Sequence, residues 1–397
     1  MITDSRRANA HIHLPPNFSA FETVGQAVDL ASAQGLAVLG ASNYYDYTVY
    51  SEFAALAESK RIYPLFGIEI IALIPELQAA GIKLNDPGNP GKMYICGKGI
   101  SRFKPMSEAA AALLQVIRDK DSARMTAMTE ALGAIFDGAG LKTGLDEAAI
   151  KARIVRRHGC PPETLYLQER HLAQAFQEAL FEMVSVQNRP DMLERLFSAA
   201  PTSHPDDSVG IQNEIRLHLM KAGKPAYVEE TFVDFDHAYQ LILALGGMPC
   251  YPVLADGARR ICSYEEDIDR LIENTKSRGV LAAEFIPIRN TPEVLSHYVS
   301  AMRGAGLVVT AGTEHNTLDL LPMEPTCLNG EPTPAEIKDI FWEGACVVAG
   351  NQEARARGTT GYMDSLGRLN PDFTRDADRI EAFRVIGEAA ILECARN

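Results

Sequence analysis

The apolar run Leu36-Ala37-Val38-Leu39-Gly40 leads into Ala41-Ser42-Asn43, and a second apolar run extends from Ile62 to Ile71. Segments with helical spacing of apolar residues precede the two runs, at 21–34 and 49–59. Apolar strands that alternate with helices are typical of a parallel sheet covered by helices. The first hundred residues therefore predict an α/β fold.

The composition of the chain changes after these strands. From residue 105 to 245 the sequence is rich in Ala, Leu, Glu, Arg and Met and has almost no strand-like run, which predicts a helical insertion. Apolar strand runs return at 248–254, 280–286 and 307–311. We expect residues 1–104 and 246–350 to form one barrel, residues 105–245 to form the insertion, and residues 351–397 to form a C-terminal helical extension.

Composition and charge limit the classes of function. Hydrophobic residues make up 46% and charged residues 23% of the 397 positions, as in an ordinary globular protein. The net charge of −14 argues against an extended nucleic-acid surface, which requires clustered Lys and Arg. No apolar run is long enough to cross a membrane, and no apolar signal core follows the polar start. The seven cysteines are scattered without a Cys-x-x-Cys pair, so we expect a protein of the reducing cytoplasm.

The tripeptide His11-Ile12-His13 carries the strongest chemical signal. Residues two apart project from the same side of an extended segment, so both imidazoles can approach one metal ion. Three later apolar runs also end on candidate ligands, at Glu69, Glu284 and Glu314-His315. In parallel α/β barrels the active site lies where the strands end, and imidazoles mixed with carboxylates suit Zn, Mn or Fe. The pattern predicts a metal site at the edge of the barrel where the strands end, which we call the rim.

The order of these segments resembles the PHP (polymerase and histidinol phosphatase) superfamily of metal-dependent phosphoesterases. His11-Ile12-His13 is similar to its first motif, and Gly67-Ile68-Glu69 is similar to its Gly-x-Glu motif. Further similar segments follow in the same order: residues 94–100, Glu169-Arg170-His171-Leu172-Ala173, residues 223–228 and 246–249, and residues 310–315. The resemblance implies a (β/α)7-type PHP barrel with a helical insertion and a di- or trinuclear metal site.

The sequence also departs from the pattern of that superfamily. Ala41-Ser42-Asn43 replaces Thr-Asp-His, Tyr94 and Tyr251 stand where histidines are usual, and Glu314-His315 replaces Asp-x-His. Because a phenol has a pKa near ~10, tyrosine is a poor ligand at neutral pH. We therefore expect one or two divalent ions (Zn, Mn or Fe) rather than three. The expected ligands are His11, His13, Glu69, His171, Glu314 and His315.

Other polar residues are candidates for catalysis and substrate binding. We expect His11, His13, Glu69, Glu314 and His315 to be catalytic, and the following to contact substrate: Asn43, Lys92, Tyr94, Lys98, Arg170, His171, Tyr251 and Arg289. The Pro- and Gly-rich stretch from Asn85 to Lys98 predicts a loop with cationic tips over the rim, and an ordinary connecting loop is the alternative. Simple ion pairing remains the alternative for two carboxylates, Glu69 with a buried Arg and Glu284 with Arg289.

The leading functional interpretation is a metal-dependent hydrolase of PHP type that acts on a small phosphorylated or otherwise anionic substrate. We expect the insertion to cover the site and to bring Arg170 and His171 toward the metal. One alternative is a degenerate PHP barrel that binds a ligand or partner without hydrolysis. Another is non-phosphate chemistry, such as that of a lyase or C–O hydrolase, with a single metal.

Overall fold

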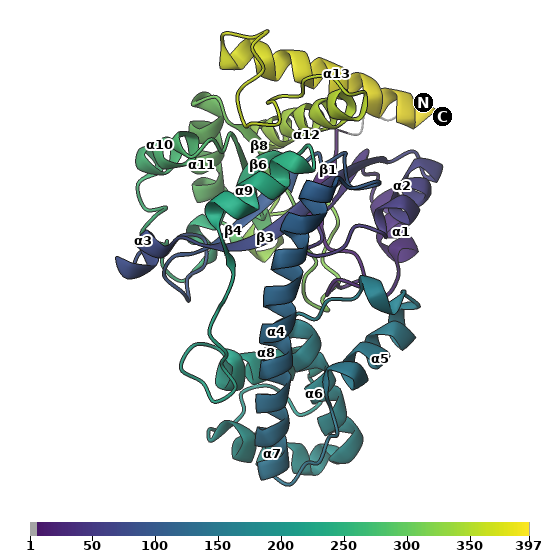
Figure 1. Cartoon of the computed structure of the whole chain (residues 1–397), viewed down its shortest axis with the longest axis vertical. Coiled ribbons are helices and arrows are strands. Elements are labelled where there is room, and N and C mark those ends of the chain that lie inside the picture. The colour runs from purple at the N-terminus through teal and green to yellow at the C-terminus, as the bar shows by residue number, and fades with distance from the viewer. Residues whose placement is uncertain (1–5, 397) are drawn as a thin grey trace.

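A nearly closed barrel of seven strands forms the centre of the protein in a computed structural model, which describes residues 6–396 (Figure 1). The first five residues of the polar start lie outside the described residues. In barrel order the strands are β1 (Ala8–Ile12), β2 (Val38–Ala41), β3 (Tyr63–Leu73), β4 (Lys92–Lys98), β6 (Met248–Val253), β7 (Ala282–Phe285) and β8 (Val308–Ala311). The backbone amide of His13 donates to the Glu314 carbonyl (2.8 Å) and the Glu314 amide donates to the His11 carbonyl (2.9 Å), which joins the first strand to the last. The expected (β/α)7-type barrel is confirmed.

Strand β4 is antiparallel to both of its neighbours, β3 and β6, so the prediction of a wholly parallel sheet was wrong. No long helix lies between β3 and β4; the connection holds only the short helix α3 (Pro75–Ala79) and the Pro- and Gly-rich loop. A parallel neighbour would require a longer crossover. The start of β4 therefore lies at the rim where the other strands end, and its last residue, Lys98, pairs with Gly67 deeper in the barrel.

Alternate residues of β4 face the barrel interior. Lys92 and Tyr94 line a cavity at the rim, and Cys96 and Lys98 approach Glu284 farther in. The intervening Met93 and Ile95 are buried in the apolar core between the sheet and the surrounding helices. This two-residue period is the ordinary property of a strand, and here it places one strand across the full depth of the site.

Helices cover the outside of the barrel, as the alternation in the sequence predicts. The covering helices are α1 (Val24–Ala33), α2 (Tyr50–Ser59), α9 (Phe235–Ala244), α10 (Ile268–Ser277) and α11 (Pro292–Gly304). Each presents an apolar face to the sheet, and several begin at a side-chain cap; the Thr23 hydroxyl accepts from the amide of Gln26, for example (3.1 Å).

Two long helices, α12 (Ala335–Ala356) and α13 (Asp376–Arg396), close the end of the barrel opposite the rim (Figure 1). Glycines permit their close approach. A Cβ atom at Gly344 would lie 2.0 Å from the Val309 carbonyl oxygen, and one at Gly387 would lie 1.8 Å from the Cys346 carbonyl oxygen. The two helices therefore pack closely against this end of the barrel.

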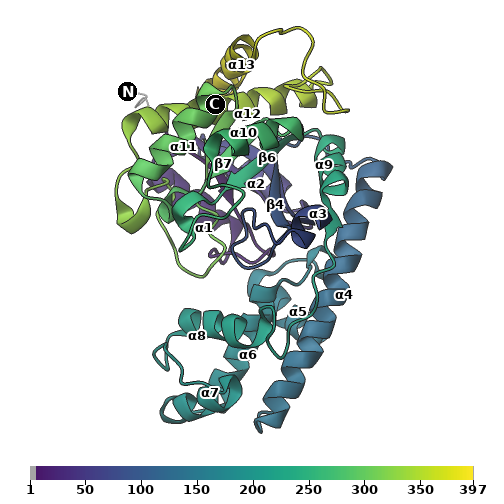
Figure 2. The same ribbon diagram turned by 90° about the vertical axis from the view of Figure 1, so that its left-hand side faces the viewer.

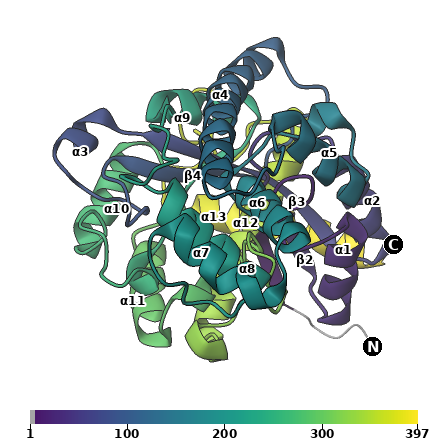
Figure 3. The same ribbon diagram turned by 90° about the horizontal axis from the view of Figure 1, so that it is seen from below.

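The helical insertion lies beyond the rim (Figures 2 and 3). It contains α4 (Glu108–Gly138), α5 (Glu147–His158), α6 (Glu169–Met183), α7 (Arg189–Phe197), α8 (Ser208–Ile215) and a π-helical turn (Arg216–Met220), around an apolar core of its own. Seen from below, α6, α7 and α8 lie across the end of the barrel (Figure 3).

The expected boundaries between parts of the chain do not all coincide with element ends. The short strand β5 (Val233–Asp234) pairs with β3, and α9 packs on the sheet, although both fall within residues 105–245. The boundary after residue 350 falls inside α12. Among the described helices, none has the length and apolar character needed to cross a membrane.

Candidate functional site

The side chains of His11, His13 and Glu69 converge inside the rim, and we call them the His/Glu triad. The Oε2 atom of Glu69 lies 3.1 Å from Nε2 of His13 and 3.7 Å from Nε2 of His11. All three residues are almost fully buried, and none of these three atoms has a hydrogen-bond partner. Unpaired buried polar atoms are costly, so this arrangement favours a bound ligand.

A divalent metal ion fits the His/Glu triad. Two ligand atoms at zinc-like distances of about 2.0–2.1 Å in a tetrahedron lie roughly 3.3 Å apart. The two separations involving Glu69, 3.1 and 3.7 Å, fall on either side of this value. Three protein ligands with a free fourth position are typical of a catalytic rather than a structural zinc site. Three of the six ligands expected from the sequence, His11, His13 and Glu69, thus lie close enough together to bind one ion.

A second group of donors lies on the other side of His11. Glu284 accepts from Nδ1 of His11 at 2.6 Å and from the Nζ of Lys98 at 2.5 Å, and Cys96 approaches the same carboxylate. We call Lys98, Glu284, Cys96 and His11 the Lys98 cluster. Burial opposes ionisation of Glu284, but Lys98 and then His11 outweigh it and lower the pKa of Glu284 to about 2. Glu284 is therefore an anion that fixes His11 with Nδ1 protonated and leaves Nε2 free to bind a metal.

Glu314 forms a bidentate ion pair with Arg289, in which one contact, between Nη1 and Oε1, is 2.9 Å. Asn316 donates to the same carboxylate. Because both oxygen atoms of Glu314 have protein partners, its expected role as a metal ligand was wrong. The expected pairing of Glu284 with Arg289 was also wrong, since Lys98 neutralises Glu284 instead.

His315 and His171 are not metal ligands either, because protein groups satisfy their rings. In His315, Nδ1 meets the Thr313 hydroxyl (2.7 Å) and Nε2 meets the Leu321 carbonyl (3.0 Å). His171 caps α6 by accepting from the Gln168 amide at 3.1 Å, and its ring packs against Phe18. Burial lowers the pKa of His171 to about 3, so the ring is neutral and offers no charge to a substrate anion.

Two other expected substrate contacts are structural. Asn43 both accepts from the amide and donates to the carbonyl of Leu14, each at 2.9 Å, and so ties two rim loops together. The Tyr251 hydroxyl donates to the buried Glu265 at 2.9 Å. Neither Asn43 nor Tyr251 lines the rim cavity. Both expectations were wrong, because Asn43 binds neighbouring backbone and Tyr251 binds a buried carboxylate of the protein instead of a ligand.

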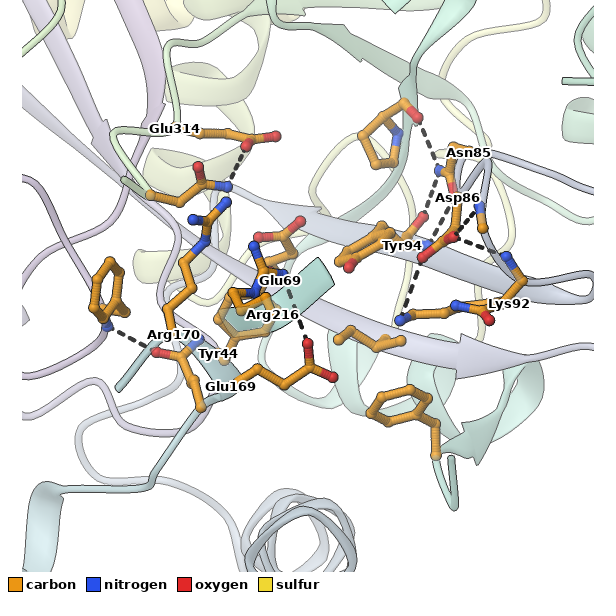
Figure 4. A pocket seen from close by; sticks show the side chains of 18 of the residues that line it. Tyr44, Glu69, Asn85, Asp86, Lys92, Tyr94, Glu169, Arg170, Arg216 and Glu314 are labelled. Carbon is orange, nitrogen blue, oxygen red and sulfur yellow. Dashed lines mark hydrogen bonds and ion pairs between the residues drawn. The ribbon is translucent and has the colours of Figure 1, made fainter. Parts of the chain in front are cut away.

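A cavity of about 550 Å³ lies between the rim and the insertion (Figure 4). This volume suits a small organic molecule. Of the triad, Glu69 reaches the cavity wall. Aromatic side chains form much of the wall: Phe18, Tyr44, Tyr45, Tyr94 and Phe232. Tyr44 stacks on His13, with ring centroids 5.2 Å apart, and its hydroxyl interacts with Glu69.

Two arginines extend into the cavity from the insertion (Figure 4). In the described part of the chain, the side chain of Arg170 has no hydrogen-bond or ion-pair partner. Burial, followed by the neighbouring Arg216, lowers the pKa of Arg170 to about 10. Arg216 contacts Glu169 at 3.6 Å, and its buried Nε has no partner. Arg170 therefore brings a positive charge to the cavity without an ion-pair partner among the described residues, which favours an anionic ligand.

The start of α6 sets the position of Arg170. Gln168 accepts from the Phe18 amide at 2.7 Å, which ties α6 to the loop that follows β1. His171 and Gln168 complete a reciprocal cap at the same helix start. The expectation that the insertion brings Arg170 to the site agrees with its place in the cavity wall, whereas His171 serves to anchor the helix.

The expectation for the two lysines of the rim loop needs correction. Lys92 belongs to β4 and lines the cavity, but it is paired with Glu230 (2.8 Å) and Asp86 (3.3 Å). Lys98 is enclosed in the Lys98 cluster and does not reach the cavity wall. Tyr94 does line the cavity, and burial raises its pKa to about 12, so its hydroxyl stays protonated.

Asp121, in the cavity wall, provides a test of the electrostatics. Burial raises its pKa from 3.8 to about 6, although Tyr45 and Arg124 oppose the shift. Because the pKa of Asp121 is higher in the folded state, protonation of Asp121 adds to the free energy of unfolding. This stabilisation is complete below pH 3.8 and is lost as the pH rises through about 6. We expect Asp121→Asn to be more stable than wild type by roughly 2–3 kcal/mol at about pH 8, and equal to it at about pH 4. Urea unfolding at both pH values measures this difference; an equal difference at both would contradict it.

Sequence reasoning missed three features of the site. Arg216 has no motif around it, and its place depends on the π-helical turn, a local distortion that often occurs at functional sites. Tyr44 follows Asn43 directly and gave no separate signal. The pairing of Lys98 with Glu284 depends on the reversed direction of β4.

Comparisons with known proteins show the fold. No protein-family model matches the chain, and no curated protein matches its sequence. An amidohydrolase from Chromobacterium violaceum, solved with bound sulfate and no metal, is 20% identical, with a TM-score of 0.53 over 84% of this chain and 96% of that chain. A protein from Bifidobacterium adolescentis, provisionally described as a metal-dependent phosphoesterase, is 15% identical, with a TM-score of 0.56 over 84% and 94% of the two chains. This chain shares their fold.

Proposed function

We propose that the protein is a metal-dependent hydrolase of a small anionic substrate, with a phosphoester as the leading candidate. The observation that carries the proposal is the meeting of three unpartnered, buried ligand atoms in the His/Glu triad beside a cavity that contains an unpaired Arg170. The descriptions of the two structural neighbours support the same class of chemistry.

His11, His13 and Glu69 would hold the ion. When bound, a divalent ion there supplies Lewis-acid polarisation and makes water a stronger nucleophile. Glu284 keeps His11 in the tautomer that binds through Nε2. The Tyr44 hydroxyl, whose pKa is raised well above 10.0 by burial, remains a proton donor at the cavity wall.

The arginines would bind and orient the anionic group of the substrate. A guanidinium binds a phosphoryl group through two parallel hydrogen bonds, which fixes its orientation as well as its position. Arg170 can form this contact because it has no ion-pair partner among the described residues. Arg289 is already paired with Glu314 and holds that carboxylate in position. The aromatic wall excludes water from the rest of the substrate.

The decisive experiment measures metal content and turnover together. Purified protein is loaded separately with Zn or Mn, its metal content is determined, and it is assayed on a panel of phosphomonoesters and phosphodiesters. We expect one ion per chain and hydrolysis that a chelator abolishes. Metal content far below one ion per chain, with no turnover, would refute the proposal.

A single metal triad also favours a second candidate, a hydrolase or lyase that acts on a C–O bond. Many phosphoryl-transfer sites use two ions, about 3.5–4 Å apart, and the cation of the Lys98 cluster fills the space beside His11. Carboxylate-bearing esters and lactones in the same assay panel distinguish this candidate. If it holds, the protein hydrolyses these compounds and leaves the phosphoesters intact.

Arg170→Met tests the anion site. We expect the KM for an anionic substrate to rise about 10–100-fold with little change in melting temperature, because one charge-assisted contact contributes about 1.5–3 kcal/mol and Arg170 has no protein partner to lose. The matched control is Arg156→Met, an exposed arginine of the same insertion outside the cavity. A KM unchanged in both variants would contradict the role of Arg170.

A further inference from the structure

The Lys98 cluster contains a complete second set of metal donors. His11, Cys96 and Glu284 each offer one ligand atom, these atoms lie within 4.8 Å of one another, and all three residues are buried. By geometry alone the site could hold a second ion beside the His/Glu triad, with His11 shared between them. The occupant of this second position therefore determines how many ions the protein binds.

A cation of the protein already lies there. The Nζ of Lys98 is 2.5 Å from Glu284 Oε1, 3.4 Å from His11 Nδ1 and 3.2 Å from the carbonyl of Ala10. It is almost fully buried, and it brings the positive charge that balances Glu284. A metal ion held by His11, Cys96 and Glu284 would lie against the same carboxylate as this ammonium group. It would also require His11 Nδ1, which is engaged at 2.6 Å by the other oxygen of Glu284.

We propose that the ammonium group of Lys98 permanently replaces a second metal ion, so that the protein binds one ion only. This inference rests on the proposed metal site at the His/Glu triad and extends it. Lys98 acts here as a positioning residue: it neutralises Glu284, and Glu284 in turn orients His11. The substrate then meets one exchangeable ion, with the second charge supplied by a covalently attached side chain.

Replacement of Lys98 by a neutral residue of similar shape should restore the second site. We expect Lys98→Met to bind two Co(II) ions per chain where wild type binds one. Because Cys96 would be a ligand in the restored site, the second ion should add a thiolate-to-cobalt absorption band that wild type lacks. The added Cys96→Ala change should remove this band. The matched control is Lys92→Met, which removes a buried lysine of the same strand outside the cluster and should show no such band.

Metal titration followed by elemental analysis and absorption spectroscopy provides the readout without any activity assay. If Lys98→Met fails to fold, Lys98→Gln keeps a polar group beside Glu284 without the charge and should bind the second ion with the same thiolate band; one ion and no band in a folded Lys98→Gln would equally overturn the inference. Two ions in wild type, or one ion and no band in a folded Lys98→Met, would overturn the inference. No ion in wild type would instead refute the metal site itself, so the two failures are distinguishable.

Discussion

Glu69→Gln is expected to lose metal and activity while keeping the fold. The change removes the charge of the one carboxylate in the His/Glu triad with little change in volume. Loss of an outer partner of a metal ligand typically costs about 10–100-fold in affinity or activity, and loss of a direct ligand should cost at least as much. The melting temperature of the metal-free protein should change little, because Gln keeps the volume of Glu69 and its amide oxygen can still accept from the Tyr44 hydroxyl. Elemental analysis, turnover and thermal unfolding measure the three quantities.

Glu314→Gln is the matched control for this prediction. Glu314 is also a buried acid at the rim, but it is paired with Arg289. We expect this variant to keep its metal and to lose stability, because Arg289 is left without its bidentate partner. A Glu69→Gln protein that keeps full metal occupancy and melts earlier would show that Glu69 serves only as a counter-ion.

Glu284→Gln should have the largest effect on stability. The change leaves the buried ammonium of Lys98 without an anion and weakens the support of His11. Removal of one partner from a buried ion pair typically costs about 3–5 kcal/mol. We expect a loss of this size in urea unfolding of the metal-free protein, together with a metal affinity about 10–100-fold lower.

The double variant Lys98→Met/Glu284→Gln separates the charge effect from a packing effect. Once both charges are removed, no unpaired ion remains, and replacement of a buried pair by neutral groups of similar size is often nearly neutral. We therefore expect the double variant to recover most of the stability lost in Glu284→Gln. A double variant as unstable as the single one would mean that shape, and not charge, stabilises this part of the barrel.

The fold could be predicted from the sequence because its signals are local. Alternating apolar strands and helices define the barrel, and the change in composition near residue 105 marks the start of the helical insertion. The direction of β4 was not predictable in this way. Strand direction depends on the length and content of the connection. The Pro- and Gly-rich stretch from Asn85 was predicted to be a loop, but the sequence analysis did not infer that so short a connection reverses β4.

The His/Glu triad was likewise predictable, since its members stand out in the sequence as a His-x-His pair and as a carboxylate in an apolar run. In the structure Glu69 lies within β3, and its side chain meets those of His11 and His13. The failures involve residues whose roles depend on partners distant in sequence. The sequence suggests Glu314 as a metal ligand, but in the structure Arg289 pairs with it. His315 was also suggested, but Thr313 and Leu321 bind the two nitrogen atoms of its ring. A sequence shows which side chains are able to bind a metal, but only the fold shows which of them the protein has already satisfied.

The two-residue period of β4 makes this strand intolerant of length changes. Lys92, Tyr94, Cys96 and Lys98 reach the cavity wall and the Lys98 cluster from one side of a single strand. Inserting or deleting one residue in the middle of β4 would turn every side chain beyond that point to the opposite face. The ammonium of Lys98 would leave the barrel interior, and an apolar side chain or a gap would take its place beside Glu284. Among proteins of this kind, differences in length should therefore accumulate in the rim loop before Lys92. They should be absent from the seven residues of β4, Lys92–Lys98.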